Sequence, residues 1–303
     1  MRLTTAQAKR IAWVSRKLGN ALRPSEALVL KDILDGKENL EVRLERRLHS
    51  EYGFEADERH LKSVGLMLAN EFERTKELKE QWAGAEMISL TKEGGWQVAD
   101  SFLKDLQDGV EFKAMLEALL DFILARAKRL AADRLPGTFL RLNAAYTYED
   151  VCRLLDWGQN MPAQNIGGYC YDKDSDTLPI FVNYEKESKA IQYHDEFKSV
   201  STILTLSKTK RTIESPDALR MRKVKTEKAD YSATAIHLFV RRNKDDKEAK
   251  AFYYLGQMDL AAPLNEVELP GAHGSSKAFE ALWTLRHPVR SDIYEYITGE
   301  KAK

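Results

Sequence analysis

Hydrophobic residues recur at helical spacing from residue 4 to about residue 135. The residues at intervals of three or four positions are Ile11, Val14, Leu18 and Leu22, followed by Leu40, Leu44 and Leu48. Because an α-helix has 3.6 residues per turn, this interval places them on one face of a helix. Strand-like alternation is almost missing here, so we expect an all-helical region. Its longest helices are predicted over residues 61–82 and 110–130.

Helix boundaries in this region are marked by residues that cap or break helices. Ser25 stands directly before Glu26 and an apolar run, as an N-cap residue does. Glycines at positions 36, 53, 84 and 94–95 separate further helical pieces. Leu135-Pro136-Gly137 ends the pattern, since proline lacks a backbone donor and glycine favours turns. We therefore predict one domain over residues 1–135 and a second over residues 136–303.

The second half has short apolar runs rich in β-branched and aromatic residues. The predicted strands are residues 178–184, 202–206, 236–240 and 252–255, with residues 191–194 as a neighbour of the first. Thr147 is predicted to cap a short helix, and another helix is expected over residues 291–297. Residues 277–285 fit either a strand or a helix. The fold class expected for the whole chain is α+β, with helices first and a β-rich domain after them.

The composition fits a two-domain globular protein. The chain has 303 residues, 43% of them hydrophobic, which is enough for a core in each half. No apolar run approaches the roughly 20 residues of a membrane-spanning helix, and the first residues lack a signal-peptide pattern. We expect a cytoplasmic protein. Cys152 and Cys170 are the only cysteines and form no CxxC pair, so we expect free thiols, no metal site and no cofactor.

Positive charge is concentrated in the predicted sheet. Fourteen Lys and Arg residues stand against seven Asp and Glu between residues 198 and 250, although the net charge of the chain is zero. The polar and basic residues that follow two strands are Ser207, Lys208 and Arg211, and then Arg241, Arg242 and Lys244. Two basic strand ends in one small sheet favour a shared edge that contacts nucleic-acid phosphates. A solvated hairpin loop explains residues 241–244 equally well.

The segment Asn165-Ile-Gly-Gly-Tyr169 is a candidate binding loop. Its glycines let the backbone take a positive φ or approach another surface closely. Gly167 and Gly168 would also cradle a phosphate through backbone N–H groups, and a simple tight turn explains them equally well. Most neighbouring aromatic residues belong to the predicted core. Tyr169 or Tyr193 is predicted to stack on an unpaired or flipped base.

Enzymatic motifs are largely missing from the sequence. It contains no GxxxxGK[ST] phosphate loop, so ATP hydrolysis is not expected, and it contains no HExxH or GxSxG motif. A weak pattern joins Asp176 to Glu196-Phe-Lys198, the acid-x-Lys spacing with which metal-dependent nucleases hold Mg²⁺. Such triplets also arise by chance in charged chains. His194, beside Asp195, is a candidate general base, and a half-exposed histidine at a strand end is the simpler interpretation.

Several segments from residue 146 onward resemble, in order, a known family. They are residues 146–155, 165–169, 179–184, 193–197, 207–208 with Arg211 and Ser215, 238–246, 252–256 and 288–294. They resemble the C-terminal domain of unknown function found on large DEAD/DEAH-type helicases and on modification-dependent restriction enzymes. The resemblance covers about half of the chain. Residues 1–135 look like the helical connector that precedes this domain, whereas helicase and nuclease portions have no counterpart here.

This resemblance implies a barrel-like module that grips duplex DNA, including DNA with methylated cytosine, and accepts a flipped base. Our first hypothesis is a non-enzymatic DNA-binding accessory module of a helicase- or restriction-type defence or repair system. The second is a protein-interaction module that docks a separately encoded helicase, which an exposed apolar stripe on the N-terminal helices would favour. The third is a metal-dependent nuclease using Asp176, Glu196 and Lys198. The predicted DNA-binding residues are Asn165, Gly167, Gly168, Tyr169, Tyr193, Ser207, Lys208, Arg211, Arg241, Arg242 and Lys244.

Overall fold

The chain forms two compact units. A computed structural model describes residues 3–161, 168–185, 195–227, 229–243, 250–271 and 274–301. The helical unit comprises Met1–Leu140 and Glu149–Pro162, and the sheet unit comprises Arg141–Tyr148 and Ala163–Lys303. The chain therefore enters the sheet unit, returns to the helical unit and leaves it again. A single domain boundary near residue 135 stays a prediction.

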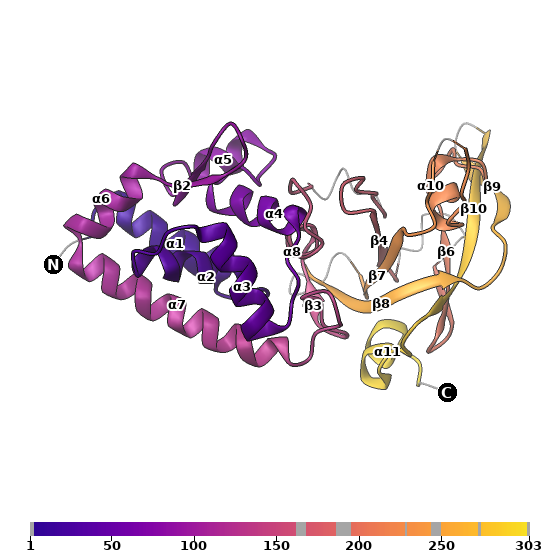
Figure 1. The fold of residues 1–303 in the computed structure, drawn as a ribbon. Helices are drawn as coiled ribbons and strands as arrows, with labels where there is room; N and C mark the ends of the chain where they lie inside the picture. Colours follow the sequence, from indigo (N-terminus) through magenta and orange to yellow (C-terminus); the bar gives the residue numbers. More distant parts are fainter. Residues whose placement is uncertain are drawn as a thin grey trace. The chain divides into compact units, whose positions relative to one another are not determined.

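Helices make up most of the helical unit. They are α1 (Thr5–Leu18), α2 (Ser25–Leu34), α3 (Leu40–Tyr52), α4 (Glu58–Leu68), α5 (Lys76–Gln81), α6 (Asp100–Asp108), α7 (Val110–Ala131) and most of α8 (Tyr148–Leu154). The long helix predicted over residues 110–130 is confirmed as α7, and α1 and α2 pack against it (Figure 1). Apolar residues at helical spacing, such as Leu44 and Leu48 of α3, are buried in the core as their pattern predicts.

Two expectations for this unit are wrong. The unit is not all-helical, because β1 (Ile88–Leu90) and β2 (Trp96–Val98) form an antiparallel hairpin. Gly94, at φ 85°, lies in its turn instead of separating two helices. The continuous helix expected over residues 61–82 is interrupted after α4, where Asn70 takes a left-handed conformation at φ 56°. Thr75 then caps α5 through its side chain.

A buried charge network joins α2 to α8. Arg23 and Arg153 both donate to Glu26, at 2.7 Å and 2.9 Å for their closest ion pairs, and the Glu26 side chain is fully buried. Ser25 is the first residue of α2, whereas Pro24 takes the predicted N-cap position. The Ser25 hydroxyl instead lies 2.8 Å from His60 Nε2. Buried charges of this kind hold a fold in place only while every partner is present.

The described residues of the sheet unit form eight strands in one sheet. The strands are β3 (Ala145–Tyr146), β4 (Thr177–Asn183), β5 (Glu196–Ser199), β6 (Thr202–Leu206), β7 (Ala235–Arg241), β8 (Phe252–Leu260), β9 (Asn265–Gly271) and β10 (Gly274–Leu285). Their order is β4-β7-β8-β10-β6-β5, with β3 on β8 and β9 on β10. Only β4 and β7 pair in parallel among the described strand pairs. The described part of the unit also contains the short helices α10 (Pro216–Met221) and α11 (Ser291–Thr298).

The sheet confirms the β-rich expectation but is not a closed barrel. Its strand path ends at β4 on one side and β5 on the other, and no described pairing joins these two strands. The strands predicted at 178–184, 202–206, 236–240 and 252–255 are present, and residues 277–285 are strand. The strand predicted at 191–194 lies outside the described residues. β9 was not predicted, because its sequence combines Pro270 and Gly271 with few apolar residues.

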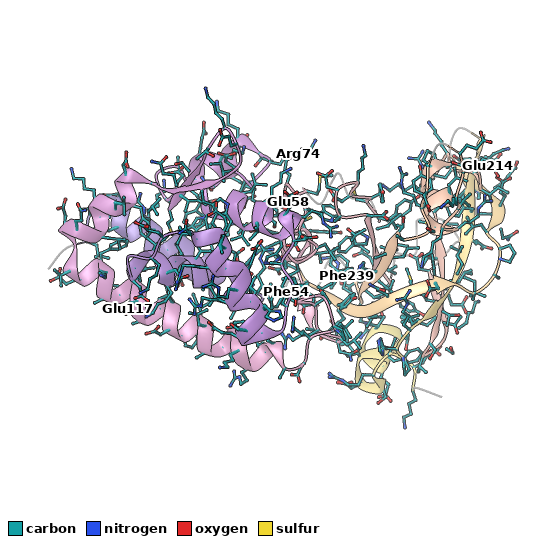
Figure 2. All side chains as sticks on the ribbon, viewed as in Figure 1. Phe54, Glu58, Arg74, Glu117, Glu214 and Phe239 are labelled. Atoms are coloured by element: carbon teal, nitrogen blue, oxygen red, sulfur yellow. The ribbon has the colours of Figure 1, made fainter. Side chains whose placement is uncertain are left out.

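Aromatic side chains and a bulge shape the centre of this sheet. Phe239 of β7, labelled in Figure 2, stacks between Phe181 and Tyr254 with ring centroids 5.1 Å and 4.9 Å away. Leu238 of β7 pairs with Gly256 of β8, whereas the next residue, Phe239, pairs with Tyr254, so β8 contains one extra residue at this point. Gly256 lies beside this extra residue with φ +100°, a conformation that side chains disfavour. In the described part of the chain, every helix is too short or too polar to cross a membrane.

Candidate nucleic-acid interface

A pocket of about 170 Å³ lies in the sheet unit between β4 and the chain that leaves β6. Its lining residues are Gly168, Tyr169, Ile180, Phe181, Val182, Asn183, Asp195, Thr205, Leu206, Ser207 and Lys208. Strands β7, β8 and β10 separate β4 from β6 along the sheet, so the sheet must curve to bring both to one cavity. Four of the predicted DNA-binding residues line the pocket, namely Gly168, Tyr169, Ser207 and Lys208. These come from two segments that are about 40 residues apart in the sequence.

Tyr169 forms one wall of the pocket and is held from both sides. The segment 168–169 runs along β4, with the Phe181 N–H donating to the Gly168 carbonyl at 2.6 Å and Tyr169 bridging to Ile180. The Tyr169 hydroxyl donates to Asp217, and Lys208 Nζ lies 4.6 Å from the centre of the tyrosine ring. Burial raises the pKa of Tyr169, and the bond to Asp217 adds to this effect. The ring is therefore neutral and fixed.

Asp195 contributes a carboxylate to the same pocket. It is 9% exposed, and the Leu206 N–H donates to its Oδ1 at 3.0 Å. In the sequence this residue stands out only as a neighbour of His194. Nothing in the local pattern distinguishes it, because its burial depends on β6, eleven residues further along the chain. A buried carboxylate that lines a cavity is a strong acceptor for amino groups of a ligand.

Three lysines belong to the loop after β6 or to the strand beside it. Lys208 lines the pocket, Lys210 is exposed, and the Arg211 N–H donates to the Lys277 carbonyl at 3.2 Å, which brings β10 alongside. Burial lowers the pKa of Lys208. Within the described residues, none of these three lysines forms an ion pair. They are the cations of this edge that remain available to a polyanion.

Other predicted basic residues already have partners in the fold. Arg211 Nε donates to Asp217 Oδ2 at 3.1 Å, and Arg242 Nε donates to Glu185 at 2.7 Å. Arg241 donates to Asn183 Oδ1 at 2.6 Å, and its guanidinium lies over the Phe252 ring. The positive excess between residues 198 and 250 is thus reduced by acids outside that window, including Glu185. The contact of these arginines with phosphates stays a prediction.

Several predicted residues lie outside the part of the chain that the structure describes. They are Asn165, Gly167, Tyr193, His194 and Lys244. Gly168 is described and takes the positive φ that its position was expected to need, at 92°.

The nuclease candidates are engaged in local bonds. Asp176 accepts from the Tyr171 and Thr234 hydroxyls at 3.0 Å and 2.7 Å, while Lys198 donates to Glu196 at 2.5 Å. In the described ranges, no three His, Cys, Asp or Glu side chains gather in a way that could hold a metal ion. The nuclease hypothesis stays a prediction that requires metal-dependent cleavage lost on Glu196→Gln.

A second polar constellation lies in the helical unit. His60 Nε2 is 2.8 Å from the Ser25 hydroxyl, and His60 Nδ1 is 3.0 Å from Asp156 Oδ2. This order of groups matches the Ser-His-Asp arrangement of hydrolases. Ser25 is 0% exposed and His60 only 1%, however, so a substrate has no access to the hydroxyl. The three residues form part of the structural network around Arg23.

Comparisons with known proteins match one domain-family model to each half of the chain. The model described as Domain of unknown function (DUF3427) matches residues 140–297, and that described as Domain of unknown function (DUF8090) matches residues 1–132. The resemblance to a domain of unknown function is thereby confirmed, whereas association with a helicase stays a prediction. The search of curated proteins gave no match.

Three solved structures show distant similarity. The DNA modification-dependent restriction endonuclease AspBHI gives a TM-score of 0.31 at 10% identity over 53% of this chain and 51% of that chain. KRYPTONITE in complex with mCHG DNA and SAH gives 0.30 at 10% identity over 52% and 34%. Arabidopsis thaliana SUVH6 in complex with SAM gives 0.31 at 12% identity over 77% and 38%. This chain thus spans about half or less of each. TM-scores this low do not show a common fold.

Proposed function

The chain belongs to the family described as Domain of unknown function (DUF3427), and we propose that it is a DNA-binding module without catalytic activity of its own. The observation that supports this proposal is the pocket beside the basic loop after β6. One cavity combines the fixed aromatic Tyr169, the buried acceptor Asp195 and the cation Lys208. Aromatic stacking, base-edge hydrogen bonding and phosphate contact are the three interactions that nucleic-acid recognition uses.

Lysines of the loop after β6 and of the neighbouring β10 would position the sugar-phosphate backbone. Lys208, Lys210 and Lys277 come from two neighbouring segments and present positive charge on one edge of the unit. Phosphate contacts carry little sequence information but supply most of the affinity, and they make it dependent on salt.

The pocket itself would accept one base. Its volume is well below the roughly 300 Å³ at which drug-sized ligand sites begin, so a single ring system is the appropriate size of ligand. A carboxylate accepts from the exocyclic amino group of cytosine, a pairing known from base readout. The buried side chains of Ile180 and Val182 form an apolar wall of the pocket. This wall would suit the methyl group of a modified cytosine, which makes methylated DNA the preferred ligand of the proposal.

One double variant and one control test this assignment. Lys208→Ala combined with Lys210→Ala should weaken duplex binding and lower the slope of log affinity against log salt by about one unit for each phosphate that the variant no longer neutralises. Lys92→Ala, an exposed lysine on the β1–β2 turn, is the matched control and should leave both quantities unchanged. Equal affinities for all three proteins would remove the loop after β6 from the interface.

Base insertion has a separate readout. A mismatched base is easier to extrude than a paired one, so wild-type protein should bind a duplex with one mismatched cytosine more tightly than the fully paired duplex. Asp195→Asn places an amide donor near the cytosine amino group and should reduce that preference. A wild-type protein that does not distinguish the two duplexes would leave phosphate contact but no base pocket.

Protein interaction is a second candidate function, and one observation favours it. Met115 and Phe122 on α7 are 48% and 57% exposed, and an exposed apolar stripe on the N-terminal helices is the feature expected to favour docking. Docking of a separately encoded helicase remains the corresponding proposal. Capture of a helicase by the wild-type chain, and its loss on Phe122→Glu, would support it.

A further inference from the structure

Helix α7 has two apolar faces, and only one of them is buried by the residues that the structure describes. The face formed by Phe112, Leu116, Leu120, Ile123 and Ala127 is buried, and α1 and α2 pack against the helix (Figure 1). A second set, defined here as the α7 stripe, comprises Met115, Ala118, Leu119 and Phe122. These residues follow the spacing of three and four that places them side by side along a helix.

The α7 stripe is unusual for the surface of this protein. Met115 is 48% exposed, Phe122 is 57% exposed, Ala118 is exposed and Leu119 is half-buried. Val110, at 78%, is also exposed, but it lies at the start of the helix and away from the stripe. Glu117 (labelled in Figure 2) lies on a different side, where it accepts from Lys31 of α2 at 3.0 Å. An exposed Phe and Met on one helical line mark an interaction surface.

Opposite charges stand at the two ends of the stripe. Glu111 lies one turn before Met115, and Arg126 lies one turn after Phe122. Both are exposed, and neither forms an ion pair within the described part of the chain. Along this line the acidic residue comes first, the four apolar residues of the stripe follow, and the basic residue comes last. The line is about 22 Å long, at 1.5 Å of helix per residue.

We infer that the α7 stripe binds a second copy of this chain through an antiparallel, two-fold symmetric helix pair. A two-fold axis between residues 118 and 119 places Met115 opposite Phe122 of the second copy, and Ala118 opposite Leu119. The same axis places Glu111 opposite Arg126. Every position of the stripe then meets a complementary one, as an isologous interface requires. A parallel pair would instead set Glu111 against Glu111 and Arg126 against Arg126.

The expected dimer is weak. One helix face of this length buries less than the roughly 800 Å² per partner of a standard stable interface. Exposed ion pairs add little energy but strongly favour one orientation. Association in the micromolar range, weakened by salt, is the expected behaviour. The inference is independent of DNA binding, since it involves only the helical unit and is tested without nucleic acid.

Sedimentation velocity of the full chain, over a concentration series at low salt, measures this association. Wild-type protein should dimerise reversibly, and Phe122→Glu should be monomeric. Val42→Glu is the control, because Val42 is 53% exposed on α3 and outside the α7 stripe. It should dimerise as the wild type does. A wild-type chain that stays monomeric at high micromolar concentration would overturn the inference.

Charge reversal tests the antiparallel register. Glu111→Arg alone and Arg126→Glu alone each turn two attractive pairs into two repulsive ones, so each should weaken the dimer by about tenfold. Mixing these two variants restores both attractive pairs and should yield heterodimers of wild-type strength. The Glu111→Arg/Arg126→Glu double variant should also recover self-association. Mixtures and double variants as weak as the single variants would refute the proposed pairing.

Discussion

Replacing Glu26 with glutamine should destabilise the helical unit severely. Glu26 is fully buried and accepts four hydrogen bonds, two from Arg23 at 2.7 Å and 3.0 Å and two from Arg153 at 2.9 Å each. Glutamine has the same shape, but it removes the negative charge and turns a donor toward a guanidinium. Two buried cations would then lose their main counter-ion.

The expected cost follows from burial of both partners. The Arg23 side chain is 0% exposed and that of Arg153 is 2% exposed, so water cannot replace the missing carboxylate. Breaking a buried ion pair by removing one partner typically costs about 3 to 5 kcal/mol. Arg23 retains Asp156 at 2.8 Å, which places the expected value toward the lower end of that range.

Hydrogen–deuterium exchange localises the effect to one unit. Amides of α2 and α8 should exchange about a hundredfold faster or more in Glu26→Gln, because each 1.4 kcal/mol corresponds to a factor of ten. Amides of β7 and β8, in the sheet unit, serve as internal reference. Glu51→Gln is the matched control, since Glu51 forms an exposed pair with Arg47 and should change exchange by a few-fold at most.

The pH dependence of the effect has a defined sign. Burial alone would raise the pKa of Glu26, but Arg153 and Arg23 hold it well below its usual value. A carboxyl group whose pKa is lower in the fold than in the unfolded chain stabilises the fold at every pH above the unfolded pKa, which is near 4.3. This contribution is lost only as the pH falls from there toward the lower pKa of the folded state. The cost of Glu26→Gln should therefore be constant from pH 6 to 8. A change no larger than that of Glu51→Gln would refute the role given to this network.

Two further predictions concern the sheet unit. Burial, with a contribution from Arg286, lowers the pKa of His237 to about 4, so the unfolded chain binds a proton that the fold does not, and stability should fall by about 3 kcal/mol between pH 6.5 and 4. Urea unfolding against pH should show this slope in wild type and not in His237→Gln; an equal slope in both would assign it to other groups. Gly256→Ala should destabilise the unit by more than about 1 kcal/mol, because φ is +100° and a Cβ atom would lie 3.0 Å from Leu142 Cδ2. Unchanged thermal unfolding of the alanine variant would show that the β7–β8 bulge relaxes without strain.

The pattern of apolar residues predicted helices that bury one face and strands that are buried on both faces. Helix α7 shows its buried face directly as Phe112, Leu116 and Leu120, and β4 is an unbroken apolar run. The β1–β2 hairpin was missed because three-residue strands around Gly94-Gly95 are too short for alternation to show. The break between α4 and α5 depends on the left-handed Asn70, which the sequence does not distinguish from an ordinary helical asparagine.

The pocket was predictable in part. Tyr169 and Lys208 were selected for their chemistry, and the fold brings them within one cavity. Asp195 could not be selected, because its burial depends on the contact with Leu206 of β6, eleven residues further along the chain. Arg211 and Arg241 were also predicted to contact phosphates, whereas Asp217 and Asn183 bind their side chains in the fold. Such partners lie up to 58 residues away and carry no local signal.

The most direct test of DNA binding is a salt titration of wild-type affinity for matched duplexes with and without 5-methylcytosine, alongside the single strand of the same sequence. We predict salt-dependent duplex binding that is tighter for the methylated duplex, because the pocket offers a carboxylate to the cytosine amino group and an apolar wall to the methyl group. Absence of binding to all three nucleic acids at moderate salt would contradict the proposed function.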